Sequence, residues 1–168
     1  MSVDLAIGLL ACLGWAAILL HAHFNPSRRI WPPRHPTWFT VVWAWGLTTL
    51  IYVSIVRLGD WETAKQSLPP FVHIFGLVLA IAGSLYHSWA TSALGLKATS
   101  GWPEGGSYPV ARCTKGPYKH VTHPQYIGQS LSFVGLAIVG GSLTGSLVAA
   151  VGCATLALAS YIEHQHLA

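Results

Sequence analysis

The stretch "FVHIFGLVLAIAGSLYHSWATSAL", residues 71–94, contains no lysine, arginine, aspartate or glutamate. It is long enough to cross about 30 Å of hydrocarbon as an α-helix, which takes roughly 20 residues. The whole chain is 52% hydrophobic and 8% charged, with a mean hydropathy of +0.50, and so apolar an average exceeds what one soluble core can use. Further uncharged apolar stretches lie at residues 5–20, 38–56, 127–139 and 143–162. This pattern predicts an all-α, polytopic membrane helical bundle.

We expect about five helical segments in a single integral membrane domain, residues 1–168. Gly140, Gly141 and Ser142 directly follow the short fourth segment, so the last two segments are expected to form a helical hairpin. Between the third and fourth segments lies a loop, residues 95–125, that shows no helical period. Loops of that length are usually functional or disordered, and this one carries aromatic residues and prolines that can pack, so we expect an ordered cap on the bundle. The expected helices cover about residues 5–20, 38–56, 71–94, 126–140 and 143–163.

The basic residues predict how the chain crosses the membrane, because loops rich in Lys and Arg stay in the cytoplasm. We expect the N-terminus outside, and the loop 95–125 and the C-terminus in the cytoplasm. The formal charge of +4 is explained by this topology, and the basic clusters interleaved with aromatic residues that would bind nucleic acid are missing from the sequence. Trp31 and Trp38, in the proline-rich first loop, are typical of anchors at the level of the lipid head groups. The first loop carries Arg28, Arg29 and Arg34, the second Arg57 and Lys65, and the third Lys97, Arg112, Lys115 and Lys119.

Polar and titratable residues gather at the end of the long loop, in "GPYKHVTHPQY", residues 116–126. Pro124 fits the first turn of the fourth segment, where its missing N–H costs nothing, and the free amides of that turn suit an anion. Glu163, at the end of the fifth segment, is returned by the expected topology to the same surface as His123. The acid and the histidine together form a candidate site, although a terminal glutamate can also be an interface residue that reaches water.

The motif "CTKGPYKHVTHPQYIG", residues 113–128, resembles a motif of the integral membrane methyltransferases related to isoprenylcysteine carboxyl methyltransferase and phospholipid N-methyltransferase. That family's motif has the form T-x-G-P-Y-[RK]-x-x-R-H-P-x-Y-x-G. The flanking stretches "GSLYHSWATSALG", residues 83–95, and "EHQHL", residues 163–167, are similar to two weaker motifs of the same family. The resemblance implies transfer of a methyl group from S-adenosylmethionine to a lipophilic or membrane-associated acceptor, an amine, a thiol or a carboxylate, at the cytoplasmic face of the membrane.

The resemblance also implies roles for individual residues. A sulfonium donor is cationic and carries an adenine and an amino acid moiety, so its site needs an acid, amide donors and aromatic or apolar walls. The methyl group is already activated, so the protein mainly aligns donor and acceptor and excludes water, and no metal is required. The residues expected to act in catalysis are His120 and His123, either of which can take up a proton, and Glu163. The residues expected to contact the cofactor are Val110, Ala111, Arg112, Cys113, Tyr118, His123, Pro124, Gln125, Tyr126 and Glu163.

Three positions depart from the family pattern. Thr122 stands where the motif has an arginine, His164 replaces a second acid after Glu163, and Ala159 stands where carboxyl-methylating relatives carry an arginine. A buried substrate carboxylate would lack a cationic partner there, which favours an acceptor that is neutral when it reacts, such as an amine or a thiol. The same departures leave room for an alternative, a catalytically inactive relative that serves as a structural or assembly subunit of a membrane protein complex.

The nine histidines raise the alternative of a metal or haem site. A membrane di-iron site needs more histidines in longer boxes and carboxylate partners, which are scarce here. His73 and His87 lie on one face of a single predicted helix, and no second helix repeats their spacing. We expect no metal site, and we expect His87 to hydrogen-bond within the bundle or toward the candidate site.

Overall fold

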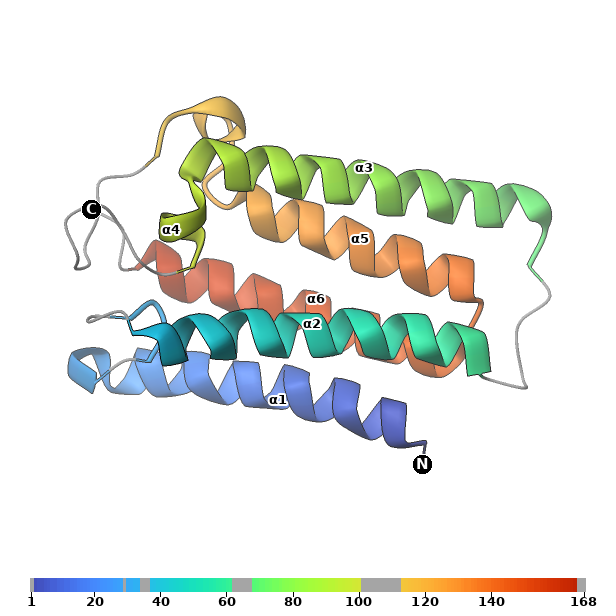
Figure 1. Cartoon of the computed structure of the whole chain (residues 1–168), viewed down its shortest axis with the longest axis horizontal. Helices are drawn as coiled ribbons and strands as arrows, with labels where there is room; N and C mark the ends of the chain where they lie inside the picture. The colour runs from blue at the N-terminus through green and yellow to red at the C-terminus, as the bar shows by residue number, and fades with distance from the viewer. Residues whose placement is uncertain (1, 29, 34–36, 62–67, 101–112, 166–168) are drawn as a thin grey trace.

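The computed structural model describes residues 2–28, 30–33, 37–61, 68–100 and 113–165, and every regular element in these ranges is helical (Figure 1). The all-α helical bundle predicted from the sequence is therefore confirmed. The longest helices lie side by side along the long axis of the molecule. The elements are α1 (Val3–Phe24), η1 (Pro26–Arg28), α2 (Trp38–Trp61), α3 (Pro70–Leu94), α4 (Leu96–Thr99), η2 (Gly116–Lys119), α5 (Pro124–Gly140) and α6 (Leu143–His164).

Four of these helices, α1, α2, α3 and α6, are long and apolar enough to cross a membrane. Helix α5 has 17 residues and ends at Gly140, and the next residue, Gly141, has a φ of 60° in the left-handed region that favours glycine. Helix α6 starts directly afterwards, because the Ser142 hydroxyl caps it by accepting the Gly145 N–H at 2.9 Å. The last two long helices thus form the predicted hairpin.

Two short helices lie within residues 95–125, where the sequence shows no helical period and predicts a loop. Gly95, with a φ of 89°, ends α3 and lets the chain turn into α4. Gly116, with a φ of 53°, and Pro117 begin η2. Each of these helices has four residues, which is too short to show a 3.6-residue period in the sequence. The structure also differs from the predicted bounds at helix ends, since α1 continues to Phe24 and α2 to Trp61.

Helix α3 packs along α5 through small residues. A Cβ atom on Gly83 would lie 2.6 Å from the Gly128 carbonyl oxygen, and one on Gly76 would lie 3.0 Å from the Gly135 carbonyl oxygen. Only glycine permits so close an approach of two helix backbones, as in membrane helices that pair through small residues. Ser84 and Ser132 add a side-chain hydrogen bond of 3.1 Å across the same contact.

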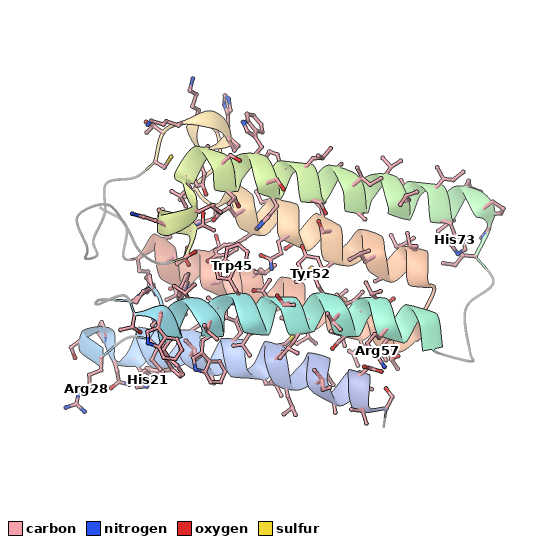
Figure 2. The ribbon with its side chains drawn as sticks, in the orientation of Figure 1. His21, Arg28, Trp45, Tyr52, Arg57 and His73 are labelled. Atoms are coloured by element: carbon pink, nitrogen blue, oxygen red, sulfur yellow. The ribbon has the colours of Figure 1, made fainter. Side chains whose placement is uncertain are left out.

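The apolar core lies between α1, α2, α5 and α6. Phe133 of α5 is fully buried, and its ring meets that of Tyr52 from α2 at 4.6 Å in an edge-on arrangement. Figure 2 shows Tyr52 and Trp45 on the side of α2 that faces α5 and α6. One end of the bundle collects the end of α1, the start of α2, α4, η2, the start of α5 and the end of α6 (Figure 1). Arg57 lies near the opposite end, where its Nε pairs with Asp4 Oδ1 at 2.8 Å (Figure 2).

Candidate active site

The carboxylate of Glu163 lies in the last turn of α6 and accepts two hydrogen bonds at the same oxygen. The indole N–H of Trp31 donates to Glu163 Oε1 at 2.6 Å, and the hydroxyl of Tyr126 donates to that oxygen as well. The side chain of Glu163 is 19% exposed. Glu163 therefore joins three segments that are far apart in the sequence. These are the connection after α1, the first turn of α5 and the end of α6.

His123 lies on the other side of the same carboxylate. Its Nδ1 is 3.6 Å from Glu163 Oε2, which makes an ion pair whenever the imidazole is protonated. Its ring stacks on that of Tyr126, with centroids 5.8 Å apart and an angle of 15° between the planes. His123 Nε2 is buried and has no hydrogen-bond partner among the described residues. A histidine held in this way can accept a proton or donate one at Nε2.

The ends of two helices set the electrostatics of this site. A negative charge at the C-terminal end of α6 is unfavourable, because the partial charge of a helix C-terminus is itself negative. Glu163 nevertheless lies there, beside the N-terminal end of α5, whose partial charge is positive. The first turn of α5 and the two donors to Glu163 Oε1 therefore offset the unfavourable position of the acid. A cation that binds near Glu163 is stabilised by a charge that the fold holds in place.

Gln125 and His87 attach the first turn of α5 to α3 and α4. His87 Nδ1 lies 3.1 Å from the Gln125 carbonyl oxygen, in agreement with the expectation that His87 bonds within the bundle. Gln125 Nε2 donates to the hydroxyls of Thr91 and Thr99 at 3.2 and 2.9 Å. The amide side chain of Gln125 thus joins α5 to the short helix α4 and fixes the wall of the site on this side.

A cavity of about 100 Å³, which we call the inner cavity, lies between the helices beside this carboxylate. Glu163 and Tyr126 contribute to its wall, and so do residues of α1, α2, α3 and α4. Its aromatic and polar lining includes Trp15, Trp31, Trp45, Gln129 and Glu163.

A second and larger space of about 660 Å³, which we call the outer groove, follows α5 and α6. His123, Tyr126 and His164 line it near the candidate site, and apolar side chains such as Ile127 and Leu156 line it farther along. Its volume lies in the range of about 300–1,000 Å³ that is usual for ligand sites. Tyr126 lines both spaces, so a ligand in the groove and a ligand in the inner cavity would meet at the Tyr126 side chain.

The structure brings some of the predicted site residues together and separates others. His123, Pro124, Gln125, Tyr126 and Glu163 form one site. Cys113 lies apart from it, against α3, with its Sγ 3.8 Å from the Ala93 carbonyl oxygen. Tyr118 is buried in η2, and His120 is exposed and lines neither of the two spaces described above. Val110, Ala111 and Arg112 lie outside the described residues.

The positions that depart from the family pattern lie around the same site. Ala159 is fully buried, so an arginine would not fit there without rearrangement of its neighbours. Thr122 and His164 line the outer groove, and the ring of His164 lies 6.4 Å from that of His123. Within the described residues, no group of three or more His, Cys, Asp or Glu side chains is placed to hold a metal ion.

Sequence reasoning missed the role of Trp31. It was expected to anchor the first loop at the lipid head groups, but its side chain is only 6% exposed and it bonds to Glu163. Its partner follows 132 residues later, and no local pattern announces a contact at that separation. Trp38, in contrast, is 73% exposed. The many prolines around Trp31 were the available signal that this loop has a fixed shape.

A model of the phospholipid methyltransferase family matches residues 71–168, which is more than half of the chain. The chain belongs to the phospholipid methyltransferase family. Phosphatidylethanolamine N-methyltransferase B of Dictyostelium discoideum is 27% identical to it over 117 residues, which cover 69% of this chain and 58% of that protein. Phosphatidylethanolamine N-methyltransferase of Malassezia globosa is 24% identical over 136 residues, which cover 78% of this chain and 14% of that protein. The chain therefore spans less than two thirds of either relative, and no solved structure matches it.

Membership in the phospholipid methyltransferase family and four helices of membrane-spanning length identify the chain as an integral membrane protein. The resemblance to phospholipid methyltransferases predicted from residues 113–128 is confirmed, while the resemblance to isoprenylcysteine carboxyl methyltransferase stays a prediction. Helices α1 and α2 and the connection between them precede the part of the chain that the family model matches. Trp31, which holds Glu163, therefore comes from outside the matched region.

Proposed function

We propose that this protein is an S-adenosylmethionine-dependent methyltransferase that methylates the amino group of a phospholipid head group. The observation that carries the proposal is the Glu163 carboxylate, held by Trp31 and Tyr126 and adjoined by His123, in a chain of the phospholipid methyltransferase family. Both relatives described above are named as phosphatidylethanolamine N-methyltransferases, and neither name describes a structural subunit. The alternative of an inactive assembly subunit therefore has no support from the comparisons.

The residues at the site suit the donor. S-adenosylmethionine supplies a methyl group that is already activated on a cationic sulfonium. Glu163 offers the negative charge that a cationic ligand needs, and the free amides at the start of α5 suit its carboxylate. His123 lines the outer groove, and its buried Nε2 has no hydrogen-bond partner among the described residues. The outer groove has room for a ligand of this size.

The acceptor nitrogen of an ammonium group has to lose a proton before its lone pair can attack a methyl carbon. His123 and Glu163 are the groups at the site that can take up that proton. The absence of an arginine at Thr122 and Ala159 fits an acceptor that carries no negative charge at the reacting atom. A phospholipid amine meets this requirement, and a carboxylate does not.

The membrane orientation is part of the proposal. We infer that the N-terminus lies outside and that the site, the loop 95–125 and the C-terminus face the cytoplasm, as the basic residues predict. Among the described residues, Arg28, Lys97, Lys115 and Lys119 belong to segments at the site end of the bundle. Arg57, near the opposite end, is paired with Asp4.

Methyl transfer from labelled S-adenosylmethionine to lipid tests the proposal. The purified chain is placed in vesicles of phosphatidylethanolamine or, as the control, of phosphatidylglycerol, which has no amine. We expect label in the lipid extract of the first vesicles alone, and at least tenfold less in the Glu163→Gln variant. Phosphatidylethanolamine that stays unlabelled although the chain binds the donor would contradict the choice of acceptor.

A further inference from the structure

Three indole rings from three different segments line the inner cavity. Trp15 comes from α1 and Trp31 from the connection that follows. Trp45, which is labelled in Figure 2, comes from α2. The rings of Trp15 and Trp31 lie 5.5 Å apart at an angle of 53°, so they form two walls that are inclined to each other. The indole N–H of Trp45 is occupied by the Ser100 hydroxyl at 3.1 Å, which fixes the orientation of the third ring.

The charge inside this cavity is negative. Glu163 lines it, and none of the described residues that line it is a lysine or an arginine. An indole ring attracts a cation to its face, most strongly where the cation has left water. Aromatic walls with one carboxylate therefore favour a compact organic cation over a neutral group of the same shape.

The cavity also has two buried donors without an acceptor among the described residues. Trp15 Nε1 and Gln129 Nε2 have no hydrogen-bond partner there, and their side chains are 5% and 4% exposed. A buried N–H that stays unpaired lowers stability, so native proteins leave few of them. Both residues line the inner cavity, so a ligand that carries an oxygen acceptor in addition to a cation is a candidate partner for these donors.

The size of the cavity limits what can enter it. A volume of about 100 Å³ is well below the roughly 300–1,000 Å³ that is usual for a complete ligand. An ammonium group with its methyl or methylene carbons fits such a space, whereas a nucleoside does not. The outer groove, at about 660 Å³, is the larger of the two spaces.

We propose that Trp15, Trp31 and Trp45, together with Glu163, form an aromatic cage that binds an onium cation. The oxygen atoms next to the cation accept hydrogen bonds from Trp15 Nε1 and Gln129 Nε2. The rings accept N-methyl groups as readily as N–H groups, so the cage holds an amine before and after methylation. This chemistry is shared by the head group of an amino phospholipid and by the amino acid end of the donor, and we assign the cage to the lipid head group. That assignment rests on the proposed function, while the binding of an onium cation does not.

Calorimetry on the full chain in a non-ionic detergent tests the cage, with choline as the probe and 3,3-dimethyl-1-butanol as its neutral isostere. We expect choline to bind at least fivefold more tightly than the isostere. Trp45→Leu should lower the affinity for choline about fivefold to thirtyfold, and Trp45→Phe should lower it less. Trp43→Leu is the matched control, because Trp43 and Trp45 lie on the same helix and are both 40% exposed, and Trp43 does not line the cavity. Equal binding of choline and its isostere, or equal effects of Trp43→Leu and Trp45→Leu, would overturn the cage.

A second variant tests the oxygen acceptor. Gln129→Leu removes one of the two unpartnered donors, so it should weaken binding of glycerophosphocholine and leave binding of tetramethylammonium, which has no oxygen, nearly unchanged. The same loss for both probes would show that Gln129 acts on the shape of the cavity, which would overturn its role as a donor to the ligand.

Competition identifies the source of the cation. If the cage binds the lipid head group, both ligands bind at once, so saturating glycerophosphocholine lowers the affinity for S-adenosylmethionine only to a limiting value, because the two cations share Glu163. Complete displacement of S-adenosylmethionine, with an apparent dissociation constant that rises without limit as glycerophosphocholine is added, would assign the cage to the donor and overturn the lipid assignment. The methyl-transfer assay is read separately. Choline binding without methyl transfer counts against the proposed function alone, and methyl transfer by a chain that does not prefer choline to its isostere counts against the cage alone.

Discussion

Trp31 donates its indole N–H to Glu163 Oε1 at 2.6 Å, across a separation of 132 residues. This hydrogen bond ties the connection between the first two helices to the last turn of α6. Glu163 lies near the end of the matched family region, whereas its donor Trp31 lies in the part of the chain that the family model does not match. The connection between α1 and α2, which lies outside the matched region, thus completes the site.

Replacement of Trp31 by phenylalanine should destabilise the fold. Trp31→Phe keeps an aromatic ring next to Trp15 and removes the donor, and a hydrogen bond to a charged group contributes about 1.5–3 kcal/mol. We expect a lower melting temperature in detergent. Trp38→Phe is the control, because Trp38 is 73% exposed and its replacement should change the free energy of unfolding by less than about 0.5 kcal/mol. Equal melting temperatures for the two variants would mean that the hydrogen bond contributes nothing measurable.

Removal of the charge on Glu163 should weaken donor binding. Glu163→Gln keeps the shape of the side chain, and a charge-assisted hydrogen bond worth about 1.5–3 kcal/mol corresponds to roughly ten- to a hundred-fold in affinity. Calorimetry with S-adenosylmethionine measures the loss. Asp4→Asn removes one acid from the ion pair with Arg57 near the opposite end of the bundle, and it should leave the affinity unchanged. Unchanged binding in folded Glu163→Gln would show that the acid is only an interface residue.

A methyl group at Gly128 should separate α3 from α5. A Cβ atom there would lie 2.5 Å from the backbone nitrogen of His87, which cannot move aside as a flexible side chain can. Gly128→Ala should therefore destabilise the protein by about 1–3 kcal/mol. Gly46, inside α2, has nothing within 4 Å of the position that a Cβ atom would take, so Gly46→Ala should stabilise the helix by about 0.5–1 kcal/mol. The two alanine variants should shift the melting temperature in opposite directions, and a shift in the same direction would count against the packing described for α3 and α5.

Labelling from outside the cell tests the orientation. Val3 is 74% exposed at the start of α1, and Lys119 is exposed at the site end of the bundle. In a chain whose three native cysteines have been replaced, Val3→Cys should react with a membrane-impermeant thiol reagent in intact cells, and Lys119→Cys should react only after lysis. The reverse pattern would place the candidate site outside the cell and would overturn the positive-inside assignment.

Much of the fold could be predicted from the sequence, because each apolar stretch is long and uncharged. The span over residues 71–94 differs from α3 by one residue at its start. The short helices α4 and η2 could not be found in the same way, since four residues bury too little apolar surface to leave a period. Their positions depend on the positive φ values of Gly95 and Gly116. A glycine allows a positive φ but does not require one, so the sequence does not predict these turns.

The part of the candidate site that comes from α5 and α6 could be predicted from the sequence, whereas the part that comes from α1, α2 and their connection could not. Pro124 marks the start of α5, which places His123 and Tyr126 at the N-terminal end of this helix. The helical hairpin then returns the chain and brings Glu163 beside them. The contributions of Trp15, Trp31 and Trp45 arise from packing between helices that are distant in the sequence, and an apolar helix can turn any of its faces inward. Trp15 and Trp31 are buried. Their burial could not be predicted from hydrophobic periodicity, because the chain is too uniformly apolar to show any.

The glycine contacts between α3 and α5 determine which parts of the bundle can separate. Two helices whose backbones are in contact move together as one rigid unit. The backbones of α3 and α5 approach each other at four glycines, Gly76, Gly83, Gly128 and Gly135. Under the proposed function, a lipid head group that leaves the inner cavity after methylation would have to separate these backbones if it left between α3 and α5, which is energetically costly. Helix α2 contributes the side chains of Trp45 and Thr48 to the cavity wall, and Trp45 is held by a side-chain hydrogen bond to Ser100 and not by a backbone contact. Under that same proposal, we expect the lipid to exchange with the bilayer on the α2 side, so the positions of four glycines would determine the route by which the lipid enters and leaves.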